Sequence, residues 1–133
     1  MTGFSIFVNM DNDEKWKYLI ELARNNKANF EKDEKWLVKG CGIKLYLKPT
    51  YNFGRIFFDV CTDDKTPALI SLGLGVYLCN FFSGKTPSEI LAIDPNWFVR
   101  NGFTNGLTPT RQNGFASILN QMRKYAEAYS IMG

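Results

Sequence analysis

The residue of this chain that is best suited to chemical reaction is Cys41, which lies between Gly40 and Gly42. Glycine has no Cβ atom, so a glycine on each side permits a tight turn that presents the thiol at its tip. Lys39 and Lys44 flank the turn, and nearby positive charge stabilises the thiolate, the reactive form of cysteine. These residue types favour a reactive thiol about as strongly as a turn that merely contains cysteine.

The other two cysteines are interpreted as structural. Cys79 lies in a long apolar run and is expected to pack in the core as a small hydrophobic residue. Cys61 ends an alternating segment beside a polar turn, where it could be exposed, but no neighbour would activate it. An odd count of three widely spaced cysteines argues against a disulfide framework and favours a reducing, cytoplasmic environment.

Several function classes are excluded by composition. The chain has no histidine and no Cys-x-x-Cys pair, so catalysis by a Cys-His or Ser-His pair is excluded and a zinc site is not expected. The net charge of +3, from 16 basic and 13 acidic residues, is too balanced to indicate a nucleic acid or an acidic membrane surface as partner. With 133 residues, 45% of them hydrophobic, residues 1–133 are expected to form a single domain.

Two alternating segments are expected to hold the cysteine turn in place. Apolar residues alternate with polar ones over Ile43–Lys48 and again over Arg55–Cys61, which predicts two half-buried strands. Pro49 to Gly54 is rich in turn residues and is predicted to be the loop between them. The two strands are predicted to pair as an antiparallel hairpin, which needs helices on one face for stability.

Helices are predicted both before and after this hairpin in the sequence. The run from Pro67 to Phe82 is apolar nearly all round and shorter than the roughly 20 residues that span a bilayer, so it is predicted to be a central buried helix, with Thr66-Pro67 at its start. Gly73 and Gly75 are expected to allow another element to pack closely against it. The remaining helices are predicted from about Asp11 to Asn25, from a capping box at Thr86 to Ile93, after Asp94-Pro95, and from Thr108-Pro109 onward.

Arg111 is a second unusual residue. It falls in the first turn of the last predicted helix, where the helix dipole disfavours a cation. A solvated surface arginine is the ordinary explanation. The functional alternative is an anion, or an acidic group of a partner, held at this helix start.

At these positions the sequence resembles the SufE family, the sulfur acceptors for cysteine desulfurases. The segment from Leu37 to Cys41, with a strand after it, is similar to the active-site segment of that family. Three further segments match in the same order, so that the resemblance runs from about Glu14 to Tyr125: Lys17–Leu22, Ser83–Leu91 and Leu107–Phe115, the last with its Thr-Arg-x-Asn-Gly sequence. The chain departs from the family pattern after the cysteine, where Ile43 replaces a serine and Tyr46 a tryptophan.

This resemblance implies an α+β fold, with helices packed on one face of a small antiparallel sheet, in agreement with the periodicity. It implies a sulfur carrier and activator rather than an enzyme. Cys41 would accept persulfide sulfur from a pyridoxal-phosphate cysteine desulfurase, and Gly40, Gly42, Lys39, Lys44 and Arg111 would contact that partner. The sulfur would pass to a scaffold protein of iron–sulfur cluster assembly. The cofactor belongs to the partner, so no cofactor is expected in this chain. Two alternatives are a desulfurase-binding regulator without sulfur transfer and an unrelated thiol-dependent protein.

Overall fold

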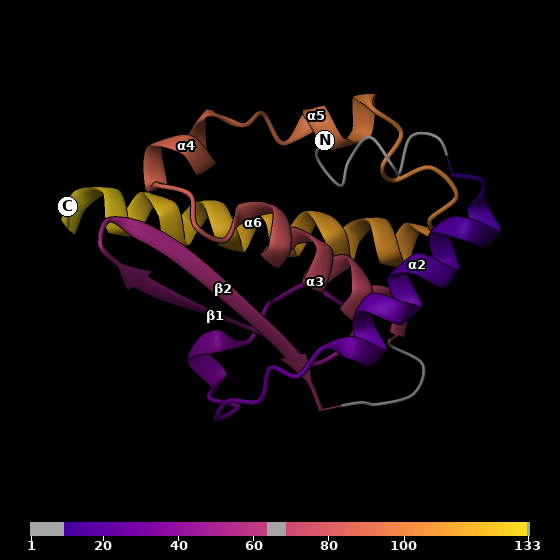
Figure 1. Ribbon diagram of the computed structural model, residues 1–133, viewed down its shortest axis with the longest axis horizontal. Coiled ribbons are helices and arrows are strands. Elements are labelled where there is room, and N and C mark those ends of the chain that lie inside the picture. The colour runs from indigo at the N-terminus through magenta and orange to yellow at the C-terminus, as the bar shows by residue number, and fades with distance from the viewer. Residues whose placement is uncertain (1–9, 64–68, 133) are drawn as a thin grey trace.

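The computed structural model describes residues 10–63 and 69–132 and packs its helices against a two-stranded antiparallel sheet (Figure 1). In chain order the elements are α2 (Asn12–Asn25), the 3₁₀ helix η1 (Glu34–Trp36), β1 (Leu45–Asn52), β2 (Arg55–Thr62), α3 (Leu69–Phe82), α4 (Pro87–Ala92), α5 (Asn96–Arg100) and α6 (Pro109–Met132). The α+β class predicted from the sequence is confirmed. The predicted helix start at Thr66-Pro67 lies outside the described residues.

The hairpin is confirmed, but its first strand lies further along the chain than the alternation predicts. The pairing runs from Leu45 opposite Thr62 to Asn52 opposite Arg55, so only Phe53 and Gly54 remain as the turn. Both have a left-handed backbone, with φ of 51° and 78°, which is the geometry of a tight two-residue hairpin turn. The predicted loop from Pro49 to Gly54 is therefore wrong for its first four residues, which belong to β1.

Pro49 is tolerated in the strand because its nitrogen faces away from the partner strand. It pairs with Phe58, whose N–H turns outward and donates to Ser83 Oγ at 2.9 Å. Directly opposite residues in an antiparallel ladder point their backbone groups the same way, either toward or away from each other. Position 49 therefore needs no N–H for the ladder, as expected for proline in an edge strand.

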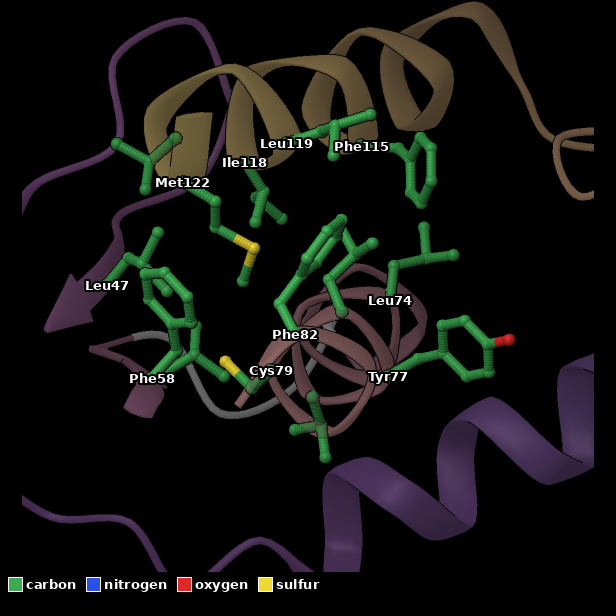
Figure 2. Close-up of a cluster of buried hydrophobic side chains, with 14 of the residues drawn as sticks. Leu47, Phe58, Leu74, Tyr77, Cys79, Phe82, Phe115, Ile118, Leu119 and Met122 are labelled. Carbon is green, nitrogen blue, oxygen red and sulfur yellow. The ribbon is translucent and has the colours of Figure 1, made fainter. Parts of the chain in front are cut away.

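The core forms where α3 meets the hairpin and α6. Of the six apolar residues predicted on the inward face of the hairpin, Ile43 precedes β1 and is only half-buried. The prediction is confirmed for the other five, which are almost fully buried: Leu45, Leu47, Ile56, Phe58 and Val60. Figure 2 shows α3 end-on, with α6 on one side of it and Leu47 and Phe58 on another. From α6, the side chains of Phe115, Ile118 and Met122 point toward α3 (Figure 2).

Close packing of α2 on α3 depends on Gly73, as predicted. A Cβ atom at this position would collide with the backbone carbonyl group of Leu19. Gly75, on another side of α3, faces side chains instead, and a Cβ atom there would lie 3.3 Å from Val60 Cγ2. The two glycines thus serve two different interfaces of the central helix.

The helix boundaries follow their capping residues. Asp11 Oδ1 accepts the N–H of Glu14 at the start of α2. Thr86 and Glu89 form the predicted capping box of α4. None of the helices in the described ranges is both long and apolar enough to cross a bilayer.

Candidate functional site

Cys41 lies on a short closed loop, residues 38–45, that leads into β1; we refer to it as the Cys41 loop. The N–H of Val38 donates to the carbonyl oxygen of Leu45 at 2.9 Å, and Leu37 forms a β-bridge with Tyr46. The Tyr46 hydroxyl also bonds to Asp63 Oδ2 at 3.2 Å. These bonds fix the base of the loop to the hairpin.

Both glycines of the Cys41 loop occupy the left-handed region. Gly40 has a φ of 85° and Gly42 a φ of 76°, a conformation that costs other residues free energy because of their Cβ atom. The prediction that this turn depends on two glycines is therefore confirmed in its geometry. Both glycines, like Lys39 and Lys44, are exposed.

The tip of the Cys41 loop packs on the N-terminal half of α6. Ser117 Oγ donates to the carbonyl oxygen of Gly40 at 3.2 Å. A Cβ atom at Gly114 would lie 3.3 Å from Cys41 Sγ, and one at Gly42 would lie 3.3 Å from the methyl group of Thr110. Thr110, Gly114 and Ser117 recur at helical spacing, so one stripe of α6 receives the whole tip.

The thiol does not project into solvent, contrary to the expectation from the sequence. Only 4% of Cys41 is exposed, and the residue belongs to the hydrophobic core cluster. The absence of a side chain at Gly114 leaves the space against α6 in which the sulfur atom of Cys41 lies. The loop therefore exposes its glycines and shelters its cysteine.

The electrostatic expectation for Cys41 also needs correction. Burial raises the pKa of the Cys41 thiol, and the backbone N–H of Ile43, which bonds to the sulfur, offsets only part of that rise. The predicted lowering of this pKa by Lys39 and Lys44 is wrong, because both side chains are exposed to solvent and neither contributes to the shift. In this conformation Cys41 is a protonated, protected thiol.

Arg111 lies at the same end of α6 as the Cys41 loop. It sits in the first turn, beside Thr110, whose methyl group faces Gly42. Its N–H donates to Thr108 Oγ1 at 3.3 Å, which supports the predicted helix start at Thr108-Pro109. The residue is half-buried, and its guanidinium group forms no ion pair with the residues that the structure describes.

Gly114 and Ser117 were not recognised from the sequence as neighbours of Cys41. The only signal available was a glycine in the interior of a predicted helix, which often indicates close packing. The periodicity of apolar residues predicts which face of α6 is buried in the core. It does not predict which segment of the chain packs beside that face. Their role follows from a contact between segments far apart in the chain.

The other two cysteines are buried. Cys79 packs in the core on α3, as predicted, and burial strongly raises its pKa (Figure 2). Cys61, which the sequence left open to exposure, is 6% exposed, and its pKa is raised by burial despite the nearby Lys32. Within the described ranges, no three His, Cys, Asp or Glu side chains lie close enough together to hold a metal ion.

Comparison with known proteins identifies the family. The sequence pattern described as "SufE: Fe-S metabolism associated domain" matches residues 4–126. The chain belongs to the SufE family. The resemblance noted from the Cys41 and Arg111 segments is thereby confirmed.

Relatives within the SufE family come from bacteria, a plant and a parasite. The chain is 30% identical over 94 residues to an uncharacterised SufE-like protein of Synechocystis, covering 71% of this chain and 57% of that protein. It is 27% identical over 88 residues to the cysteine desulfuration protein SufE of Plasmodium vivax, covering 66% of this chain and 36% of that protein. A SufE-like protein of Rhizobium meliloti is 29% identical over 119 residues, which cover 86% of this chain and 84% of that protein. This chain thus spans only about half or less of the first two relatives.

The fold is also found in a solved structure. The solution structure of a hypothetical protein from Thermus thermophilus superposes with a TM-score of 0.73, covering 94% of this chain and 90% of that one. At 17% sequence identity, the agreement concerns the fold alone.

Proposed function

We propose that this protein accepts sulfur on Cys41 from a cysteine desulfurase and passes it toward iron–sulfur cluster assembly. The observation that carries the proposal is the Cys41 loop: a cysteine between two left-handed glycines, anchored at its base and packed at its tip on α6. Membership of the SufE family, and the name of the Plasmodium vivax relative, support the class of partner.

The transfer is an exchange between sulfur atoms. The Cys41 thiolate attacks the outer sulfur of a persulfide on the desulfurase and forms a new S–S bond. The bond between the two sulfurs of the desulfurase breaks, and its electron pair leaves with the cysteine sulfur of that enzyme as a thiolate. The thiol proton of Cys41 is released before the attack, so the step needs no external oxidant or reductant.

The burial of the thiol requires that the Cys41 loop moves before transfer. A sulfur in a residue that is only 4% exposed cannot reach a persulfide on another protein. Moving the thiol into water also removes the desolvation that raises its pKa, so one movement supplies both access and ionisation. In the resting loop the same burial limits oxidation of the thiol.

The remaining candidate residues surround the moving segment. Lys39 and Lys44 are exposed on the loop, and Arg111 lies at the start of the helix on which the loop rests. They place positive charge around the transfer site, which suits an acidic surface on the desulfurase. We assign Gly40 and Gly42 to the movement itself, because glycine changes its backbone conformation at low cost.

Mass spectrometry tests the proposal. After incubation with a pyridoxal-phosphate cysteine desulfurase and cysteine, the Cys41 peptide should gain one sulfur atom, and Cys41→Ser should abolish this adduct. Cys61→Ser is the control and should keep it. An adduct found mainly on Cys61 contradicts the proposal.

A second measurement separates a carrier from a regulator. The protein should stimulate alanine release from cysteine by the desulfurase, and this stimulation should depend on Cys41. If Cys41→Ser stimulates as well as the unmodified protein, the function is regulation of the desulfurase without sulfur transfer.

A further inference from the structure

We propose that Ser117 and Gly114 form a latch that holds the Cys41 loop on α6 and sets how often the thiol becomes available. The inference rests on the proposed function for its biological purpose, since a carrier thiol must alternate between shelter and exposure. Its physical basis is independent of any partner and lies in the contacts of the loop tip.

The base and the tip of the Cys41 loop are held differently. At the base, the bond from Val38 to Leu45 and the β-bridge from Leu37 to Tyr46 belong to the hairpin. At the tip, the bond from Ser117 Oγ to the Gly40 carbonyl joins the loop backbone to α6. Opening at the tip can therefore leave the hairpin intact.

The tip contacts are suited to release. The hydrogen bond of Ser117 lies at the exposed edge of the contact, where water can replace it when the loop moves. Gly40 and Gly42 provide the conformational freedom on either side of the cysteine. The inner part of the contact is the van der Waals approach of Cys41 Sγ to Gly114.

Gly114 sets the depth at which the sulfur sits. An added Cβ atom would lie 3.3 Å from Cys41 Sγ and 3.4 Å from the Cys41 carbonyl oxygen, so the loop would have to shift outward by a few tenths of an ångström. Alanine is at the same time a better helix former than glycine in a helix interior. Gly114→Ala should thus weaken the latch without weakening α6.

The test compares the reactivity of the three thiols within one protein. Unmodified protein is treated with N-ethylmaleimide, and the modification of the Cys41, Cys61 and Cys79 peptides is followed over time by mass spectrometry. Cys79 lies in the core and reports general unfolding. Ser117→Ala should accelerate modification of Cys41 about fivefold, the effect of one ordinary hydrogen bond on an opening equilibrium, and leave Cys79 unchanged.

Ser130→Ala is the matched control. Ser130 is a second serine of α6 whose Oγ donates to a backbone carbonyl, that of Glu127, at 2.7 Å, but it makes this bond within its own helix. In this variant N-ethylmaleimide should modify Cys41 at the same rate as in the protein without substitutions. Gly114→Ala should accelerate the modification of Cys41, as Ser117→Ala does, without lowering the melting temperature.

Two outcomes overturn the latch. Equal Cys41 rates in Ser117→Ala, Ser130→Ala and the unmodified protein would show that Ser117 does not hold the loop. A parallel acceleration of Cys41 and Cys79 would show general destabilisation instead. The modification assay uses N-ethylmaleimide and no desulfurase, so its result does not depend on whether sulfur transfer occurs. Conversely, a sulfur adduct on Cys41 would support the proposed function even if Ser117 did not hold the loop.

Discussion

Gly73 of α3 packs directly on the backbone carbonyl group of Leu19 in α2, with a separation that leaves no room for a Cβ atom. Backbone atoms cannot turn aside as a flexible side chain can. The distance between these two helices is therefore fixed by the absence of one methyl group.

This contact predicts different results for two glycine substitutions in one helix. Gly73→Ala must push α2 away from α3 and should destabilise the fold by about 1–3 kcal/mol, the usual result of overpacking. A Cβ atom at Gly75 would have side-chain atoms of Val60 and Leu45 as its nearest neighbours, the closest at 3.3 Å. The higher helix propensity of alanine, about 1 kcal/mol, should compensate for this tight contact in Gly75→Ala. Urea denaturation of both variants measures the difference, and equal midpoints would contradict it.

A second pair of glycines tests the conformation of the Cys41 loop. Gly54→Ala and Gly40→Ala both place a Cβ atom in a left-handed backbone, at a cost of about 1 kcal/mol each. Gly54 has open space around it, whereas a Cβ atom at Gly40 would lie 3.0 Å from Ser117 Oγ. Only Gly40→Ala should also accelerate modification of Cys41, as measured by peptide mass spectrometry. Acceleration by Gly54→Ala would instead indicate a general effect of strain.

Arg111→Ala should weaken the response to the desulfurase while keeping the fold. Loss of one charge-assisted hydrogen bond to a partner should raise the protein concentration for half-maximal stimulation about tenfold. Arg24→Ala, at an exposed position in the last turn of α2, is the control and should change nothing. A lower melting temperature with unchanged stimulation would make Arg111 a structural residue.

The buried cysteines predict that the fold becomes less stable at alkaline pH. Burial raises the pKa of Cys41, Cys61 and Cys79 in the folded chain. Below about pH 8.5, the ordinary pKa of cysteine, both states hold these protons, and pH has no effect through them. Above it the unfolded chain loses protons that the folded chain keeps, so the free energy of unfolding falls as pH rises. Denaturation midpoints between about pH 8 and 10 should decline less steeply in Cys79→Ala than in the unmodified protein.

The sequence predicted the hairpin, the central helix and the cap of α4 correctly, because each is encoded by neighbouring residues. Alternation marked the buried face of β2 and the buried Leu45 and Leu47 of β1, although Tyr46 between them is buried as well. The capping box at Thr86 indicated the start of α4. The sequence predicts a loop at Pro49, because composition alone does not tell which way a backbone nitrogen faces. That orientation is decided by pairing with Phe58.

The site was only partly predictable for a related reason. The cysteine and its two glycines were visible in the sequence, and their left-handed geometry agrees with it. The shelter of Cys41 depends on Gly114, which approaches only when α6 packs beside the hairpin. Burial of the thiol raises its pKa, and this burial arises from packing between distant segments, so the local sequence does not reveal it.

Pro49 has a consequence for how another protein can bind. Many proteins are recognised by β-augmentation, in which a partner adds a strand to a free sheet edge through backbone hydrogen bonds. On β1 such a strand would meet an outward-facing proline without an N–H group, and on β2 the outward N–H of Phe58 is already bonded to Ser83. At these positions the sheet edges offer an added strand no free N–H group. A binding protein must therefore recognise side chains and the shape of the loops, and such recognition depends on the sequence of this protein.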